Sequence, residues 1–233
     1  MPDLWEHECA AWAQGYETVC GVDEAGAGPL MGPVYAAAVI LPRGCVIDGL
    51  NDSKKLTPKK RDALYDVIIA EAEAWAVASV SAAEIDATDI LSARMKAMQL
   101  AIDALAVRPD FALIDGNRDH GKSAAVTALH ACINGYFYGK KKASVPALTQ
   151  LLEQLARVSC GDGCSASIAA ASILAKVSRD RYVTDVLDPM YPQYGFAKHK
   201  GYGTRDHYAM LDQYGPCPEH RMTFLKKWKA GKQ

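Results

Sequence analysis

Short apolar runs alternate with amphipathic segments along this chain. The runs are rich in Val, Ile and Ala and are bounded by Gly, Pro or charged residues, which is typical of strands. They cover about residues 18–23, 33–41, 74–81, 111–114 and 157–160. Strands that alternate with helical segments predict an α/β fold, in which helices cover a sheet.

The helical segments carry start signals. Thr57 is the expected N-cap of one helix, with Pro58 at its first position, and Ser81 with Glu84 suits the capping box of a helix or helix pair running to about residue 105. Their expected buried stripes are Leu64, Val67 and Ile68, and Ile90, Met95, Met98 and Ile102. Further helices are expected at about 4–14, on the outside of the fold, and at 123–132, 145–156, 167–183 and from 222.

Carboxylates follow three of the apolar runs, each beside a glycine. These are the adjacent pair Asp23 and Glu24, then Asp115 and Asp162. Alternation along a strand directs Asp23 and Glu24 to opposite faces, but at a strand end both can lean toward one cation. A hairpin with a solvated acidic tip is the alternative for this pair.

Strand ends gather at one edge of an α/β sheet, so we expect the four carboxylates to meet there. Such a cluster repels itself unless cations neutralise it, and hard divalent ions prefer oxygen ligands. The pattern therefore predicts two-metal hydrolysis of a phosphodiester. The six histidines are dispersed, and those of the tail are expected at the surface or on phosphates.

A second motif favours a different chemistry. Residues 116–123 read GNRDHGKS, which matches the P-loop pattern of nucleotide hydrolases after a strand and before a helical segment. Against it, the acidic run at Asp23 lies upstream of the motif, and Arg-Asp-His is bulky for a loop that wraps phosphates with backbone amides.

Composition narrows the setting. The 233 residues carry a formal net charge of −1, so any basic surface for nucleic acid has to be local. Seven irregularly spaced cysteines predict reduced thiols and a cytoplasmic protein rather than a disulfide framework. The N-terminal residues lack the apolar core of a secretory signal, and no apolar stretch is long enough for a bilayer, so no membrane association is expected.

Over about residues 18–226 the chain resembles a bacterial ribonuclease HII, the type 2 ribonuclease H. The ordered motifs that carry the resemblance are GVDEAGAGPLMGPV, DSKKL, DGN, GDGCSASIAAASILAKVSRD, YPQYGFAKHKGYGT and HRMTF. Several long motifs in order are far more specific than the P-loop string. The resemblance implies a ribonuclease H-like mixed sheet flanked by helices, with a helical C-terminal extension.

The resemblance also assigns roles residue by residue. It makes Asp23, Glu24, Asp115 and Asp162 the catalytic ligands of Mg²⁺ or Mn²⁺, and leaves Asp180 structural. The implied substrate-binding residues are Gly26, Ala27 and Gly28 in the turn that reads the 2′-hydroxyl, Tyr202 against the sugar, and Ser53 and Lys54 on backbone phosphates. For Ser53 and Lys54 a solvated loop is the alternative that the residues alone favour.

Two departures from the family pattern matter. Position 27 is Ala27 where the family has arginine, so a charged phosphate contact is missing while the backbone donors of the turn remain. The stretch between Asp115 and Asp162 is also longer than the family's by roughly thirty residues, which predicts a surface insertion at about 121–155.

The resulting expectation is a monomeric, metal-dependent endoribonuclease. It would cut the RNA strand of RNA–DNA hybrids and single ribonucleotides embedded in duplex DNA, leaving 3′-hydroxyl and 5′-phosphate ends. We expect an N-terminal helical extension at 1–17, a catalytic domain at 18–190 and a substrate-binding segment at 191–233. The alternatives are a P-loop nucleotide hydrolase using residues 116–123, and a hybrid-binding protein whose turnover is weakened by Ala27.

Overall fold

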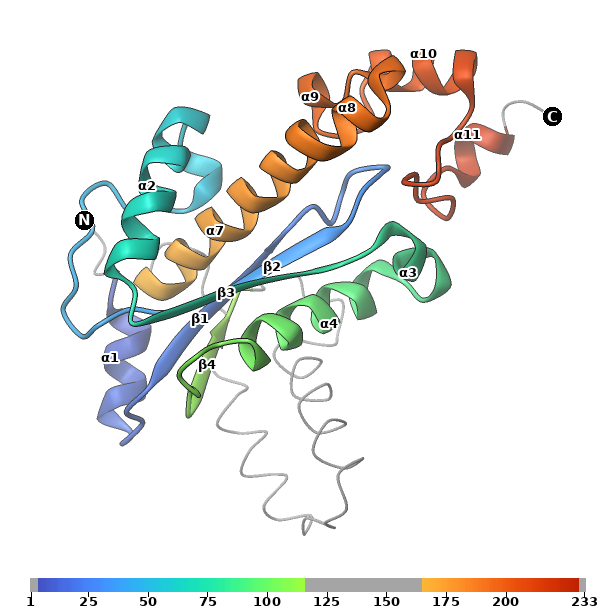
Figure 1. The fold of residues 1–233 in the computed structure, drawn as a ribbon. Coiled ribbons are helices and arrows are strands. Elements are labelled where there is room, and N and C mark those ends of the chain that lie inside the picture. The colour runs from blue at the N-terminus through green and yellow to red at the C-terminus, as the bar shows by residue number, and fades with distance from the viewer. Residues whose placement is uncertain (1–3, 116–164, 231–233) are drawn as a thin grey trace, which may run out of the picture.

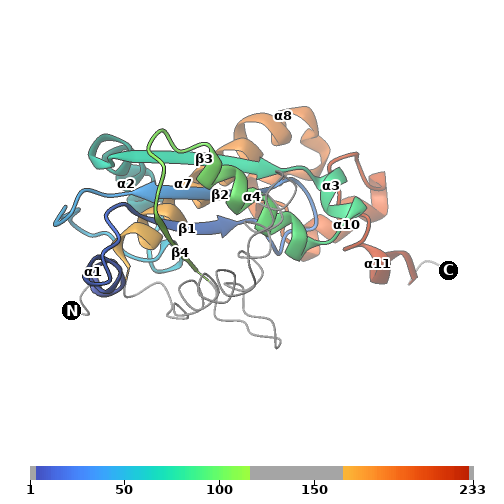
Figure 2. The same cartoon turned by 90° about the horizontal axis from the view of Figure 1, so that it is seen from below.

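A mixed β-sheet forms the centre of the molecule. The computed structural model describes residues 4–115 and 165–230, and within them the strand order is β3-β2-β1-β4 (Figures 1 and 2). The strands are β1 (Val19–Ala25), β2 (Val34–Ile40), β3 (Ala74–Val80) and β4 (Phe111–Ile114). β2 pairs antiparallel with both β1 and β3, whereas β4 runs parallel to β1. The predicted α/β class with a mixed sheet is confirmed.

β1 is central and buried on both faces. Gly21 faces the long helix α7 (Ala166–Tyr182), and a Cβ there would lie 2.1 Å from the Ser167 carbonyl carbon, so only glycine fits. Cys20 and Val22 belong to the apolar cluster on the opposite face. β1 also continues two residues beyond the predicted end, so that Asp23 and Glu24 are among the last three residues of the strand and pair with β2.

Helices cover the two faces of the sheet (Figure 1). On one face lies α7, with α2 (Pro58–Glu71) packed beside it; on the other lies α4 (Ile90–Asp103), preceded by the short α3 (Ala82–Ala87). The predicted caps are present, since Thr57 accepts from the Lys60 amide and Ser81 from the Glu84 amide. In α2 the stripe prediction was wrong at Val67, which is 42% exposed because only one narrow edge of the helix is covered.

The first helix, α1 (Glu6–Ala13), is less peripheral than predicted. Its Glu8 is fully buried and accepts hydrogen bonds from the Ser165 hydroxyl at 2.7 Å and the Ser167 amide at 2.9 Å. Glu8 thus places a carboxylate at the N-terminus of α7, where free amides and the helix dipole favour negative charge. Cys9 of the same helix is exposed.

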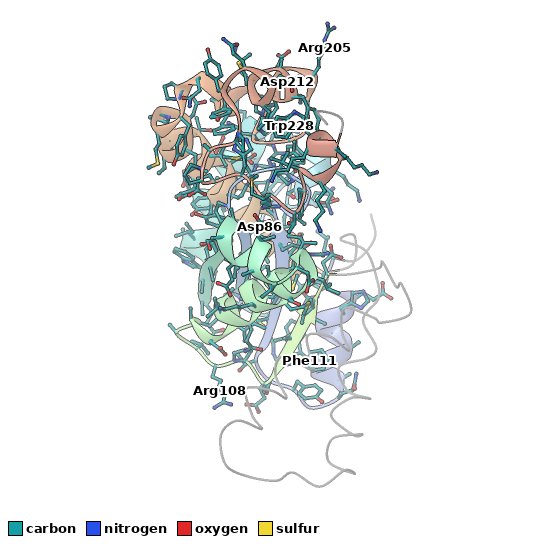
Figure 3. All side chains as sticks on the ribbon, turned by 90° about the vertical axis from the view of Figure 1, so that its right-hand side faces the viewer. Asp86, Arg108, Phe111, Arg205, Asp212 and Trp228 are labelled. Atoms are coloured by element: carbon teal, nitrogen blue, oxygen red, sulfur yellow. The ribbon has the colours of Figure 1, made fainter. Side chains whose placement is uncertain are left out.

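A helical C-terminal segment extends from α7, as predicted. The chain continues through η2 (Val183–Leu187), α8 (Asp188–Met190), η3 (Pro192–Tyr194), α9 (Phe196–His199), α10 (Arg205–Tyr214) and α11 (Lys226–Ala230). Apolar residues of the segment, among them Phe196 and Leu225, form a cluster with Leu30 and Met31, which lie between β1 and β2. Asp86 of α3 anchors it by accepting from the amides of Met222 and Thr223 (Figure 3). The last helix begins later than the predicted residue 222.

Several predictions fall outside the described residues. They are the helices at 123–132 and 145–156, the strand at 157–160, the insertion at 121–155, the P-loop motif at 116–123 and Asp162. Within the described part of the chain, none of the helices has the length and apolarity needed to cross a membrane.

Candidate active site

The site lies where β1 and β4 end side by side. Asp23 is buried, with 4% of its surface exposed, and its Oδ1 accepts from the Glu24 amide at 2.7 Å. Asp115 follows β4 directly, and its amide donates to the Val22 carbonyl at 3.0 Å, which continues the parallel pairing by one residue. This pairing brings two carboxylates, 92 residues apart in sequence, to the same edge. The solvated-tip alternative for Asp23 is wrong.

The electrostatics of Asp23 show an excess of negative charge. Burial raises the pKa of Asp23 well above its usual value, and the neighbouring carboxylates of Glu24 and Asp115 raise it further. The Glu24 amide and the positive charge of Lys54 act in the opposite direction without overcoming this. A cation beside Asp23 would relieve the repulsion, and carboxylate oxygens are the donors that Mg²⁺ and Mn²⁺ take.

The donor set therefore fits a divalent ion, although the side chains described do not complete a coordination shell. No three His, Cys, Asp or Glu side chains within residues 4–115 and 165–230 are spaced to hold a metal. Glu24 forms an ion pair with Arg94 of α4 instead of turning to Asp23. Asp162, the fourth predicted ligand, lies outside the described residues.

An open hollow lies over these carboxylates. Its walls contain every predicted site residue that the structure describes: Asp23, Glu24, Gly26, Ala27, Gly28, Ser53, Lys54, Asp115 and Tyr202.

Sequence reasoning missed two cationic side chains in the wall of this hollow, Arg61 and Lys176. The spacing of Lys176 and Asp180, four residues apart in a helix, was an available signal, and Lys176 Nζ does lie 2.9 Å from Asp180 Oδ2. Asp180 therefore forms an ion pair with Lys176 within α7.

The turn after β1 combines an unusual backbone conformation at Gly26 with hydrogen bonds from Arg221. Gly26 has a φ of 89°, a backbone conformation that side chains with a Cβ rarely adopt. Arg221 donates to the carbonyls of Gly26 at 2.7 Å and of Ala27 at 3.0 Å. In a trans peptide the amide points away from the carbonyl, so the amides of Ala27 and Gly28 point away from Arg221. Gly28 lies close to Tyr202, which lines the hollow and is 43% exposed.

Ser53 and Lys54 are ordered by the fold. They begin η1 (Ser53–Lys55), where Asp52 accepts from the Lys54 amide at 2.9 Å. The Ser53 amide donates to the Ser172 hydroxyl of α7 at 3.1 Å, and Ser53 is buried. The solvated-loop alternative is therefore wrong for Ser53, whereas Lys54 is exposed at the rim of the hollow.

Two tail histidines form part of the core rather than the surface, contrary to the prediction. His207 and His220 are 0% and 2% exposed, and their Nε2 atoms lie 3.0 Å apart. His207 Nδ1 lies 2.9 Å from the Tyr202 carbonyl oxygen, and His220 Nδ1 accepts from the Cys217 amide at 2.9 Å. Burial lowers the pKa of each ring to about 4, so both are neutral at pH 7.

Comparison with known proteins identifies the family. The family model "Ribonuclease HII" matches residues 20–230. Ribonuclease HII of Caldicellulosiruptor bescii is 46% identical over 213 residues, covering 91% of this chain and 89% of that protein. Ribonuclease HII 1 of Methylibium petroleiphilum is 50% identical over 208 residues, covering 89% of this chain and 90% of that protein.

Solved structures agree on the fold. Ribonuclease H2 from Pyrococcus horikoshii OT3 aligns with a TM-score of 0.62 at 23% identity, covering 92% of this chain and 98% of that chain. The ribonuclease HII of Archaeoglobus fulgidus, solved in a complex with PCNA, aligns with a TM-score of 0.57 at 22% identity, covering 88% and 94%. These matches do not favour the P-loop alternative. The chain belongs to the ribonuclease HII family and is an endoribonuclease of the ribonuclease H type.

Proposed function

We propose that Asp23, Glu24, Asp115 and Asp162 hold Mg²⁺ or Mn²⁺ and hydrolyse the RNA strand of RNA–DNA hybrids at this edge of the sheet. The observation that carries the proposal is the buried Asp23, whose pKa is raised by burial and by two neighbouring carboxylates beneath an open hollow. When bound, the divalent ions supply an activated water and stabilise the leaving oxygen. The protein supplies the oxygen ligands and holds them at the ends of β1 and β4.

The proposed substrates include single ribonucleotides embedded in duplex DNA. The turn at Gly26, Ala27 and Gly28 contributes backbone amides to the 2′-hydroxyl and the adjoining phosphate, and Tyr202 packs against the sugar. The 2′-hydroxyl is the group that separates RNA from DNA. The support is their common position in the wall of the hollow above Asp23. Cleavage there leaves 3′-hydroxyl and 5′-phosphate ends.

Phosphate binding is the step that Ala27 puts in question. Ala27 has no charge to offer a phosphate, but three cations line the same hollow: Lys54, Arg61 and Lys176. Ser53 and Lys54 contribute to the backbone contact in this proposal. The electrostatic attraction of the site for a phosphate strand is therefore reduced rather than abolished, which favours an active nuclease over a hybrid-binding protein with weakened turnover.

In this proposal the protein is a monomeric, cytoplasmic enzyme without a membrane partner. Residues 18–190 form its catalytic domain, 1–17 an N-terminal helical extension and 191–233 a substrate-binding segment. The support for the last division is the apolar cluster that includes Phe196, Leu211 and Leu225 and packs on Leu30 and Met31 after the turn at Gly26.

The test is cleavage of an end-labelled duplex that contains one ribonucleotide. We expect cleavage with Mg²⁺ or Mn²⁺ and none after chelation with EDTA, with product ends that a ligase or a phosphatase identifies. Asp115→Asn should lower the rate by about a thousandfold or more, since it removes a charged ligand at little change in shape. Asp103→Asn, at an exposed position of α4, is the matched control. Near-normal cleavage by Asp115→Asn would refute the ligand assignment.

A further inference from the structure

Glu24 is paired with an arginine that the proposed mechanism does not use. Nη2 of Arg94, in the first half of α4, contacts Oε1 of Glu24. Alternation along β1 explains the choice of partner, because Asp23 faces α7 and Glu24 faces the α4 side of the sheet. The side chains of Arg94 and Glu24 are 30% and 13% exposed, so water screens this pair only partly.

The Arg94 guanidinium binds a carboxylate oxygen of Glu24 that would otherwise be available to a metal ion. A divalent ion beside Asp23 gains from every carboxylate that turns toward it, and Glu24 is the nearest one along the chain. While Glu24 is bound to Arg94, that oxygen is taken and the local negative charge is reduced by one unit. Both effects oppose metal binding, since a fixed positive charge a few ångströms from a partly shielded site repels a divalent ion.

Arg94 has no other described partner that would hold it rigidly in this position. Its Nε is buried and makes no hydrogen bond within the described part of the chain. The head group is therefore fixed through Glu24 and retains an unused donor. By contrast, Lys96, two residues further along α4, pairs with Glu84 at the surface, where the two side chains are 53% and 37% exposed.

We propose that Arg94 is a positioning residue that competes with the divalent cation for Glu24, and so sets the ion concentration at which the active site fills. This inference rests on the proposed function, because Glu24 is a metal ligand only there.

The test is Mn²⁺ binding by isothermal titration calorimetry to the full chain without nucleic acid, so that activity is not the readout. Arg94→Gln keeps the side-chain stem as far as Cδ and an amide donor, but removes the charge. We expect it to bind Mn²⁺ at least about fivefold more tightly than the unchanged protein. Arg94→Lys restores the charge and should return the Kd toward the original value. Lys96→Gln removes a cation from the same helix away from the site and is the matched control.

A double-mutant cycle separates competition from a general charge effect. In the Glu24→Gln background there is no carboxylate to compete for, so Arg94→Gln should change the Kd for Mn²⁺ by much less. Far-ultraviolet circular dichroism and a melting curve confirm that each variant is folded.

The outcomes distinguish the inference from the function on which it rests. If the unchanged protein binds Mn²⁺ and cleaves hybrid, but Arg94→Gln binds Mn²⁺ equally well or more weakly, only the inference about Arg94 is overturned. If the unchanged protein binds no Mn²⁺ and cleaves hybrid in EDTA, the proposed metal site is wrong and the role of Arg94 is overturned with it.

Discussion

Arg221 Nη2 donates a hydrogen bond of 2.7 Å to the carbonyl oxygen of Gly26, which lies 195 residues earlier in the chain. The same guanidinium donates to the carbonyls of Ala27, Pro29 and Gly32 at 2.9–3.0 Å. Arg221 is fully buried, and burial lowers its pKa to about 10. The C-terminal segment thus determines the shape of the turn that follows Asp23 and Glu24.

We expect Arg221→Gln to destabilise the protein and to disorder this turn. An amide side chain cannot reach all four carbonyls, and each unpaired buried acceptor costs about 1–3 kcal/mol, so the free energy of unfolding should fall by about 3 kcal/mol or more. Urea denaturation measures this, and Arg205→Gln is the control because Arg205 is exposed on α10 (Figure 3). Equal stability of the two variants would show that the four bonds contribute nothing.

Asp23→Asn is expected to stabilise the metal-free protein while it abolishes cleavage. The raised pKa of Asp23 means that its charged form is disfavoured in the folded state, so stability falls as pH rises above the usual carboxyl pKa of about 3.9. The amide removes this penalty. The difference in melting temperature between Asp23→Asn and the unchanged protein in EDTA should therefore increase from pH 4 to pH 7. A lower melting temperature for the variant at pH 7 would contradict the electrostatic account.

The buried histidine pair makes the C-terminal segment sensitive to acid. His207 and His220 have pKa values lowered to about 4, so their contribution to stability is complete above the unfolded value of about 6.5 and is lost as pH falls toward 4. Tryptophan fluorescence should report this loss, because Trp228 packs on the same apolar cluster.

His220→Asn is the variant that isolates this effect. Its amide oxygen keeps an acceptor for the Cys217 amide but does not titrate. We expect a lower stability at pH 7 and a shallower fall between pH 6.5 and pH 4 than in the unchanged protein. A fall of the same steepness would place the acid sensitivity on other groups.

Ala27→Arg is expected to tighten binding to a duplex with one ribonucleotide. Ala27 is half-buried in the wall of the hollow, so a longer side chain from this position extends into the space that the substrate would occupy. An added contact to one phosphate should steepen the dependence of log K on log salt by about 0.9. If the contact strengthens in the transition state, the rate rises as well.

The measurement for Ala27→Arg is fluorescence anisotropy across a salt series, with Ca²⁺ in place of Mg²⁺ to slow turnover, followed by cleavage rates. Ala27→Gln adds length without charge and is the control. The same affinity and salt slope for all three proteins would mean that position 27 does not reach the substrate.

The sequence by itself determined the four described strands, the capped helices and most of the residues that line the hollow. Strand and helix periods are local properties, so the runs at β1 to β4 and the caps at Thr57 and Ser81 are confirmed. The alternation that separates Asp23 from Glu24 follows from the backbone of a single strand. Asp115 was found because carboxylates that follow parallel strands share an edge.

Only the tertiary structure decided which polar groups are buried or paired, and which partner each of them has. Glu8 at the N-terminus of α7, Arg94 on Glu24, the His207–His220 pair and Arg221 behind Gly26 all have the hydropathy of surface residues. A periodic pattern reports whether a position tends to face a core. It does not report a partner up to 195 residues away that satisfies a buried charge, because that partner is brought close by topology and not by local spacing.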